Sequence, residues 1–243
     1  MPRTRLDQLL VDRRLASSKE RARSMVMAGY VQVGGRLVIK PGTLVAAGSS
    51  IRVIQPLPFV SRGGLKLAHA LDVFHLCPRG LACLDVGAST GGFTDCLLQR
   101  GARKVYAVDV GHGQLDYRLR QDPRVDVMER VNARHGIDLP EKADLAAIDV
   151  SFISLELVIP PTARCLTADG VLLALVKPQF EAGRGKVGKG GVVRDPKVHA
   201  EVLSRLINWV VRDGGLRLAG LTPSPVLGDA GNREFFLCLT KAA

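Results

Sequence analysis

The chain has 243 residues, of which 47% are hydrophobic and 5% aromatic, and it contains 26 glycines. This length and composition are typical of a folded protein with one large and one small domain, and they exclude a disordered or fibrous chain. The formal net charge is +11, and residues 1–66 hold 12 Lys and Arg against 3 Asp and Glu, a net +9. Because basic side chains release counterions when they bind phosphates, this concentration predicts a polyanionic partner, with a merely solubilising surface as the alternative.

Several classes of protein are disfavoured by the sequence. The N-terminus lacks the apolar core of a signal peptide, and no apolar run reaches the roughly 20 residues that span a bilayer, which predicts a cytoplasmic protein. The five histidines lack metal-ligand spacing and none of them sits beside a GxSxG-type nucleophile, so neither metal hydrolysis nor triad chemistry is supported and no metal is expected. The odd number of cysteines, without a CxxC pair, predicts buried free thiols at Cys77, Cys83, Cys96, Cys165 and Cys238.

Residues 1–57 are predicted to form a small basic α+β domain. Leu6, Leu9 and Leu10 follow helical spacing, which predicts a helix from Thr4 to Arg14. A second helix is expected from Ser17, which forms a capping box with Glu20, to Gly29. The alternating run YVQVGGRLVI predicts a hairpin that turns at its two glycines.

The order RLDQLL…LASSKERARSMVMAGYVQVGGRLVIKPG resembles a small RNA-binding module first described in a small-subunit ribosomal protein. The resemblance implies that Arg3, Arg5, Lys19 and Arg23 contact RNA phosphates. Two prolines in the following stretch, IQPLPFVS, break any regular pattern and predict a linker at residues 58–63.

Residues 64–243 alternate between strand and helix patterns, which predicts an α/β domain with a mostly parallel sheet covered by helices on both faces. A first helix is expected from Gly64 to Leu76. The predicted strands are 81–86, 104–109, 125–130, 144–149, 171–176, 216–221 and 234–240, and the other predicted helices are 92–100, 113–120, 154–166 and 197–213.

The segment LDVGASTGGFTD, from Leu84 to Asp95, runs from a strand through a turn of small residues into a helix. Its glycines allow a ligand to approach the backbone, but the spacing is not GxGxxG, and no GxxxxGK[ST] motif occurs. An acid before the turn, Asp85, and another at the end of the next strand, Asp109, suit an adenosine joined to a cationic amino acid. S-adenosylmethionine is therefore the predicted ligand, with another nucleotide or a purely structural turn as alternatives.

Four charged residues form a second candidate site. Asp149 and Lys177 are predicted at the carboxyl ends of strands, where ligands gather in open α/β sheets, while Lys66 and Glu234 lie in the motifs SRGGLKL and NREFF. Lowering the pKa of a lysine from about 10.4 to about 8 needs roughly 3 kcal/mol, which burial and a second lysine can supply. A neutral Lys177 can then take a proton from a ribose hydroxyl as it attacks a sulfonium methyl group, with the two carboxylates orienting the lysines. Any one of these residues alone is more often a solvated residue at a strand end than a catalyst, so the prediction depends on the set of four.

The motifs SRGGLKL, DVGASTGGFTD, IDVSFISL, VKPQFE and NREFF, in this order behind the basic module, resemble the TlyA or haemolysin-A-like family of rRNA 2′-O-methyltransferases over almost the whole chain. The resemblance implies a Rossmann-like class I methyltransferase domain related to FtsJ, and ribosomal RNA, modified at cytidine, as the partner. It implies a catalytic tetrad of Lys66, Asp149, Lys177 and Glu234. It also implies an S-adenosylmethionine loop of Gly87, Ser89, Thr90, Gly91, Gly92 and Phe93, with Asp109 at the ribose and Glu129 and Asn132 near the adenine.

Other functions remain open at this point. A non-catalytic RNA-binding or ribosome-assembly factor would retain the same fold, and a membrane-lytic haemolysin would need a membrane-seeking helix that the sequence lacks. Base methylation is disfavoured because no Pro-Pro-aromatic motif is present in DVSF. The polar loop 181–196 is expected to be either a lid over the site or a solvated surface loop.

Overall fold

The computed structural model describes residues 3–27, 29–54 and 58–241. The chain consists of two compact units, Met1–Leu57 and Pro58–Ala243. The predicted linker at 58–63 falls inside the second unit, because the Val60 amide donates a hydrogen bond to Asp95 at 2.8 Å and Gly63 opens a helix.

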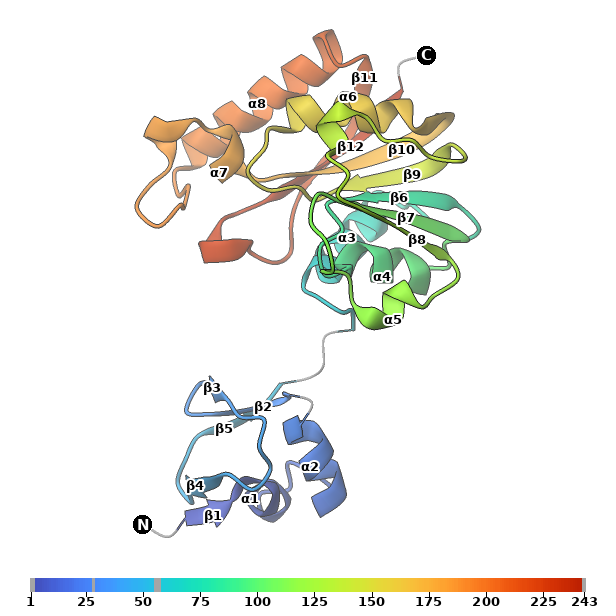
Figure 1. Cartoon of the computed structure of the whole chain (residues 1–243). Helices are drawn as coiled ribbons and strands as arrows, with labels where there is room; N and C mark the ends of the chain where they lie inside the picture. The colour runs from blue at the N-terminus through green and yellow to red at the C-terminus, as the bar shows by residue number, and fades with distance from the viewer. Residues whose placement is uncertain (1–2, 28, 55–57, 242–243) are drawn as a thin grey trace. The chain divides into compact units, whose positions relative to one another are not determined.

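The first unit contains two helices and two small sheets (Figure 1). Its core is formed by apolar residues of both helices and the first hairpin strand, including the fully buried Leu6, Leu10 and Val26. The first helix starts two residues later than predicted, because Thr4 lies in a strand that was not expected. Strands of three residues are too short to give a periodic signal. The elements are β1 (Arg3–Arg5), α1 (Leu6–Asp12), α2 (Lys19–Met27), β2 (Val31–Val33), β3 (Arg36–Leu37), β4 (Leu44–Ala46) and β5 (Ile51–Val53), paired as β1-β4 and β3-β2-β5.

A buried carboxylate, Asp7, ties the start of α1 to two basic side chains. It accepts hydrogen bonds from Arg5 at 2.7 and 3.0 Å and from Arg23 at 3.3 Å. The hydrogen bonds from Arg5 are the main cause that lowers the pKa of Asp7 from 3.8 to about 2. A carboxyl group with a lowered pKa stabilises the fold above its ordinary pKa, and that contribution is lost as the pH falls through 3.8 toward 2.

Replacing Asp7 with Asn is therefore expected to destabilise the first unit by about 2 kcal/mol, since hydrogen bonds between charged groups are lost in a buried place. Hydrogen exchange of the Leu9 and Leu10 amides in the full-length chain measures this. Asp12→Asn is the matched control, because Asp12 is exposed and accepts a hydrogen bond from Gln8 at the surface. Equal protection of these amides in the two variants would contradict the role given to Asp7.

The second unit is built on one sheet of seven strands in the order β11-β12-β10-β9-β6-β7-β8. The five strands from β10 to β8 are parallel, and β12 is antiparallel to both of its neighbours, which confirms the predicted seven-stranded, mostly parallel sheet. The strands are β6 (Ala82–Val86), β7 (Lys104–Asp109), β8 (Val125–Glu129), β9 (Ala143–Ile148), β10 (Leu166–Val176), β11 (Leu216–Pro223) and β12 (Phe235–Lys241).

Helices cover both faces of this sheet, α3 and α4 on one face and α6 and α8 on the other (Figure 1). The predicted helix at 113–120 is shorter than expected, because Gly113 has a positive φ of 73° and the Asp116 side chain caps a helix that begins only at Tyr117. The helices are α3 (Gly63–Val73), α4 (Gly92–Gln99), α5 (Tyr117–Arg120), α6 (Leu155–Arg164), α7 (Pro178–Glu181) and α8 (Pro196–Arg212), with short 3₁₀ turns η1 (Ala133–His135), η2 (Arg184–Lys186) and η3 (Asp229–Gly231).

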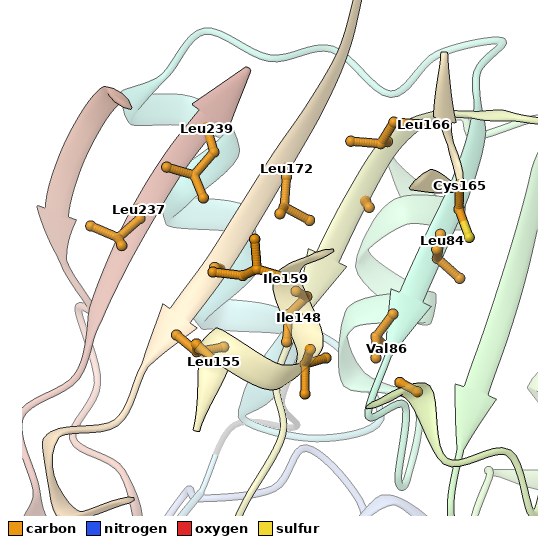
Figure 2. Packing of buried hydrophobic residues seen from close by; sticks show 14 of the residues in the cluster. Leu84, Val86, Ile148, Leu155, Ile159, Cys165, Leu166, Leu172, Leu237 and Leu239 are labelled. Atoms are coloured by element: carbon orange, nitrogen blue, oxygen red, sulfur yellow. The ribbon is translucent and has the colours of Figure 1, made fainter. Parts of the chain in front are cut away.

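The larger core lies between the sheet and the pair α6 and α8. Figure 2 shows Leu155 and Ile159 of α6 together with Ile148 of β9 and Leu172 of β10. All four are at most 2% exposed. This packing fixes the strand ends of β9 and β10, from which the candidate site is built. Among the described residues, no helix is long and apolar enough to cross a bilayer.

Candidate active site

Two adjoining cavities lie at the carboxyl ends of the central parallel strands. One has a volume of about 420 Å³ and the other about 550 Å³. They share a wall made of the turn after β6 and the loop after β9, and the shared residues are Gly87, Ser89, Asp149, Ser151 and Phe152. This is the edge of an α/β sheet at which ligands bind.

The structure brings the four predicted charged residues together in the first cavity. Lys66 comes from α3 and Glu234 directly precedes β12, and Nζ of Lys66 lies 2.6 Å from Oε2 of Glu234. Asp149 follows β9 and Lys177 follows β10, and Nζ of Lys177 lies 2.6 Å from Oδ1 of Asp149. The same amine donates a hydrogen bond to the hydroxyl of Ser151 at 3.0 Å.

Both pairs are largely withdrawn from water. The side chains of Lys66 and Lys177 are each 11% exposed, and that of Glu234 is 2% exposed. Burial raises the pKa of Glu234, and the charges of Lys66 and Lys177 oppose this rise. Because the charge of Lys177 acts on Glu234, the two ion pairs form one electrostatic cluster rather than two separate contacts.

The glycine-rich turn follows β6 and leads into α4. Ser89, Thr90, Gly92 and Phe93 line the first cavity, as does Gly87, whose φ is +88°. A Cβ atom on Gly87 would lie 2.5 Å from the backbone oxygen of Asp149, so only glycine allows the turn to approach the loop after β9 this closely.

One predicted loop residue, Gly91, does not line either cavity. It caps α4 with a φ of +97°, and a Cβ atom there would lie 2.3 Å from a methyl group of Leu119. Gly91 therefore allows the turn to form and does not line a cavity.

The second cavity has the Asp109 carboxylate on one wall, many apolar side chains, and the polar residues Ser89, Gln114, Asn132, Arg134, Asp149 and Ser151. Asp109, at the end of β7, accepts hydrogen bonds from the Ser89 amide at 2.8 Å and the Gly111 amide at 2.6 Å. Asn132 lines this cavity as expected, whereas Glu129 does not line it and forms an ion pair with Arg120. The apolar lining comes from Val86, Val108, Val110, Val131, Ala133, Val150, Phe152, Ile153 and Val158.

The sequence predicts Asp85 near the charged end of the ligand. It is fully buried in β6, lines neither cavity, and accepts a hydrogen bond from the Thr94 hydroxyl at 2.7 Å. Burial raises its pKa to about 7, with smaller contributions from the charges of Asp149 and Asp109. Within the described residues its Oδ1 atom has no hydrogen-bond partner, and contact with a ligand's charged end stays a prediction.

Sequence reasoning did not single out several residues of the first cavity. Ser151 contacts Lys177, and the rings of Phe152 and Phe180 have centroids 4.7 Å apart. Ser61, Arg62 and Gln179 also line the cavity. The available signal was membership of the same motifs, SRGGLKL, IDVSFISL and VKPQFE.

The four predicted phosphate contacts lie on the first unit and are all exposed. Arg5 and Arg23 use part of their guanidinium groups to hold Asp7, which fixes their orientation while other donors stay accessible. No cluster of three or more His, Cys, Asp or Glu with metal-binding geometry occurs within residues 3–27, 29–54 and 58–241. Four of the five cysteines are buried and Cys77 is exposed, so the expectation of buried free thiols fails at Cys77.

Comparison with known proteins agrees with this arrangement. The FtsJ-like methyltransferase family matches residues 59–241, and the S4 domain family matches residues 4–51. YqxC of Bacillus subtilis is 49% identical over 97% of this chain and 85% of its own length. The 16S/23S rRNA (cytidine-2′-O)-methyltransferase TlyA of Mycobacterium tuberculosis is 45% identical over 98% of this chain and 90% of its own length.

A solved structure of a hemolysin candidate from Streptococcus thermophilus shares 45% identity with this chain. It covers 100% of this chain and 90% of its own, with a TM-score of 0.76. The chain therefore belongs to the TlyA-like family of rRNA methyltransferases and is a methyltransferase, with an S4 domain followed by an FtsJ-like methyltransferase domain.

Proposed function

We propose that this protein transfers a methyl group from S-adenosylmethionine to a ribose 2′-hydroxyl of ribosomal RNA in the cytoplasm, at a cytidine. The observation that carries the proposal is the pair of buried lysine–carboxylate contacts in a cavity that adjoins a second, largely apolar cavity with a carboxylate wall. The name of the Mycobacterium tuberculosis relative supports the choice of rRNA, cytidine and the 2′-oxygen.

The residues of the second cavity fit the adenosine part of the methyl donor. The Asp109 carboxylate can accept hydrogen bonds from both ribose hydroxyls, and the apolar side chains suit a planar base. The turn Gly87, Ser89, Thr90, Gly92 and Phe93 then holds the amino-acid part, with Gly91 shaping the turn and Asp85 packed beneath it. S-adenosylmethionine supplies a methyl group on a positively charged sulfur, which a nucleophilic oxygen can attack.

The four charged residues have different proposed roles in the reaction. In its neutral form, Lys177 accepts the proton of the 2′-hydroxyl, while Asp149 and Ser151 hold the amine in place. Lys66, held by Glu234, places positive charge where negative charge develops on the attacking oxygen. Much of the acceleration comes from holding the oxygen in line with the methyl group inside a cavity that limits water.

The S4 domain is proposed to bind the RNA backbone through Arg3, Arg5, Lys19 and Arg23. Neutralising all four is expected to weaken rRNA binding and to reduce the slope of log K against log salt by roughly 0.7 to 0.9 for each lost phosphate contact. The proposed function as a whole is tested by transfer of a labelled methyl group from S-adenosylmethionine to ribosomal subunits that lack the modification. Incorporation into rRNA is the expected result, and its absence on every ribosomal substrate would overturn the proposal.

The raised pKa of Glu234 predicts a decrease in the rate of methyl transfer at acid pH. Because burial raises this pKa above 4.5, Glu234 is expected to take up a proton and release Lys66 at a higher pH than an ordinary glutamate would. Besides the acid-side decrease that protonation of the proposed base Lys177 causes, the rate of methyl transfer should show a further decrease above pH 4.5 that comes from Glu234, and Glu234→Gln should be slow and lack this further decrease. The profile of kcat/KM against pH for the two proteins measures this.

The free energy of unfolding should change with pH in the opposite direction to the activity. A carboxyl group with a raised pKa contributes stability below its ordinary pKa, and the contribution is lost as the pH rises through the raised value. Urea unfolding as a function of pH should thus show the native protein losing stability relative to Glu234→Gln across that range. If the further acid-side decrease in kcat/KM persists in Glu234→Gln, Glu234 is not its cause.

A further inference from the structure

We propose that Glu181 is a positioning residue for Lys177, and this inference rests on the function proposed above. Glu181 lies at the end of α7 in the motif VKPQFE, and its side chain is 2% exposed. It lines neither cavity, so we expect it to contact neither RNA nor methyl donor. A buried carboxylate so close to the site and without contact with a ligand calls for a structural explanation.

The partners of Glu181 come from two other parts of the domain. Its Oε1 atom accepts a hydrogen bond from the Leu155 amide at 2.8 Å, and its Oε2 atom accepts one from the Ser154 hydroxyl at 2.9 Å. Oε2 also accepts a hydrogen bond from Arg205 of α8 at 3.1 Å, and Arg205 donates another to the Glu181 backbone oxygen at 3.0 Å. Glu181 therefore joins α7 to the start of α6 and to the middle of α8.

These contacts are the last in a row of contacts between the two chain segments that carry Lys177 and Asp149. The strands β9 and β10 pair in register up to Ile148 and Ala174. Beyond them, Lys177 contacts Asp149 and Ser151, Phe180 packs on Phe152, and Glu181 holds Ser154 and Leu155. Residues 149–155 and 177–181 thus run side by side, joined at one end by Lys177 and at the other by Glu181.

The loop between those two ends is strained. Phe152 has a φ of +63°, and its side chain is 89% exposed. A non-glycine residue in this conformation persists only where its surroundings hold it. Because one end of the loop is held by the catalytic candidate Lys177 itself, release of the other end by loss of Glu181 would let the loop relax and move Ser151 and Asp149 relative to the amine.

Glu181→Gln is the direct test, since it keeps the size of the side chain but places an amide NH₂ group where Oε2 accepted two hydrogen bonds. We expect kcat for methyl transfer to rRNA to fall about 10- to 100-fold, as displacements of about 1 Å in an active site do. The dissociation constant for S-adenosylmethionine should rise by a smaller factor than kcat falls, because residues 149–153 of the loop also line the second cavity. Glu201→Gln is the matched control: Glu201 lies on α8, its side chain is 57% exposed, and it pairs with Lys186 at the surface.

A double-mutant cycle separates positioning from a general loss of structure. If Glu181 acts through Lys177, Glu181→Gln should slow the native enzyme about 10- to 100-fold but the residual reaction of Lys177→Ala by less than about threefold. Equal factors in the two backgrounds, or an unchanged kcat, would overturn the inference. If Glu181→Gln does not fold, Ser154→Ala replaces it in the cycle with an expected loss of about three- to tenfold, because only one of the links is removed. A native enzyme that transfers no methyl group to ribose would instead refute the proposed function, so the two failures are distinguishable.

Discussion

Lys177→Ala is expected to lower kcat for methyl transfer by about 10²- to 10⁴-fold, the usual contribution of a positioned general base. The substitution removes the amine that Asp149 and Ser151 hold in the cavity. The affinity for S-adenosylmethionine should stay within about threefold of the native value, because the loss is confined to the chemical step. Single-turnover transfer and calorimetric titration of the donor measure the two quantities separately.

Two further variants sharpen this prediction. Lys177→Arg keeps the positive charge and the contact with Asp149, but a guanidinium group stays protonated, so this variant should be about as slow as Lys177→Ala. Lys186→Ala is the matched control, because Lys186 is half-exposed and pairs with Glu201 at the surface. A Lys177→Arg enzyme with the native rate would show that charge alone suffices and that Lys177 is not the base.

Gly87→Ala is expected to lower stability by about 2 to 4 kcal/mol and to weaken donor binding at least about tenfold. The new Cβ atom would lie 2.5 Å from the backbone oxygen of Asp149, a rigid neighbour that moves only if the loop after β9 moves. That movement also displaces Asp149 and the wall shared by both cavities. Urea unfolding and donor titration measure the two effects.

Gly80→Ala provides the control for backbone strain. Gly80 has a similar φ of +77°, but no atom lies within 4 Å of an added Cβ. Gly80→Ala should therefore lower the stability only by the strain of the left-handed conformation, about 1 to 2 kcal/mol, and leave the donor affinity unchanged. Equal effects of the two substitutions would mean that the close approach at Gly87 has no bearing on the site.

The sequence predicted much of this architecture because its longer elements carry a strong period. The alternation of strands and helices after residue 63 gave the sheet and both helical layers, and the motifs identified the four charged residues that meet in one cavity. The three-residue strands β1, β4 and β5 of the first unit were missed, because three residues do not establish a period and no glycine pair marks a turn beside them. The antiparallel pairing of β12 between β10 and β11 depends on contacts across the chain that no local pattern encodes.

The arrangement at the site depends on contacts of the same kind. Asp85 and Gly91 belong to the glycine-rich motif, but whether they line a cavity depends on how the turn packs on Thr94 and Leu119. The role of Glu181 depends on contacts with residues 26 and 27 positions earlier in the chain and with Arg205 on α8. Motif membership identifies such residues, and only the packed structure distinguishes those that line a cavity from those that support it.

The central claim is that the methyl group is placed on a ribose oxygen of rRNA, and alkaline hydrolysis of the labelled product tests it most directly. A 2′-O-methyl group blocks cleavage at its own nucleotide, so the account predicts that the label is recovered in an alkali-resistant dinucleotide with cytidine at its 5′ side. With Lys177→Ala this product should be absent. Label recovered in an ordinary mononucleotide would place the methyl group on a base and contradict the account.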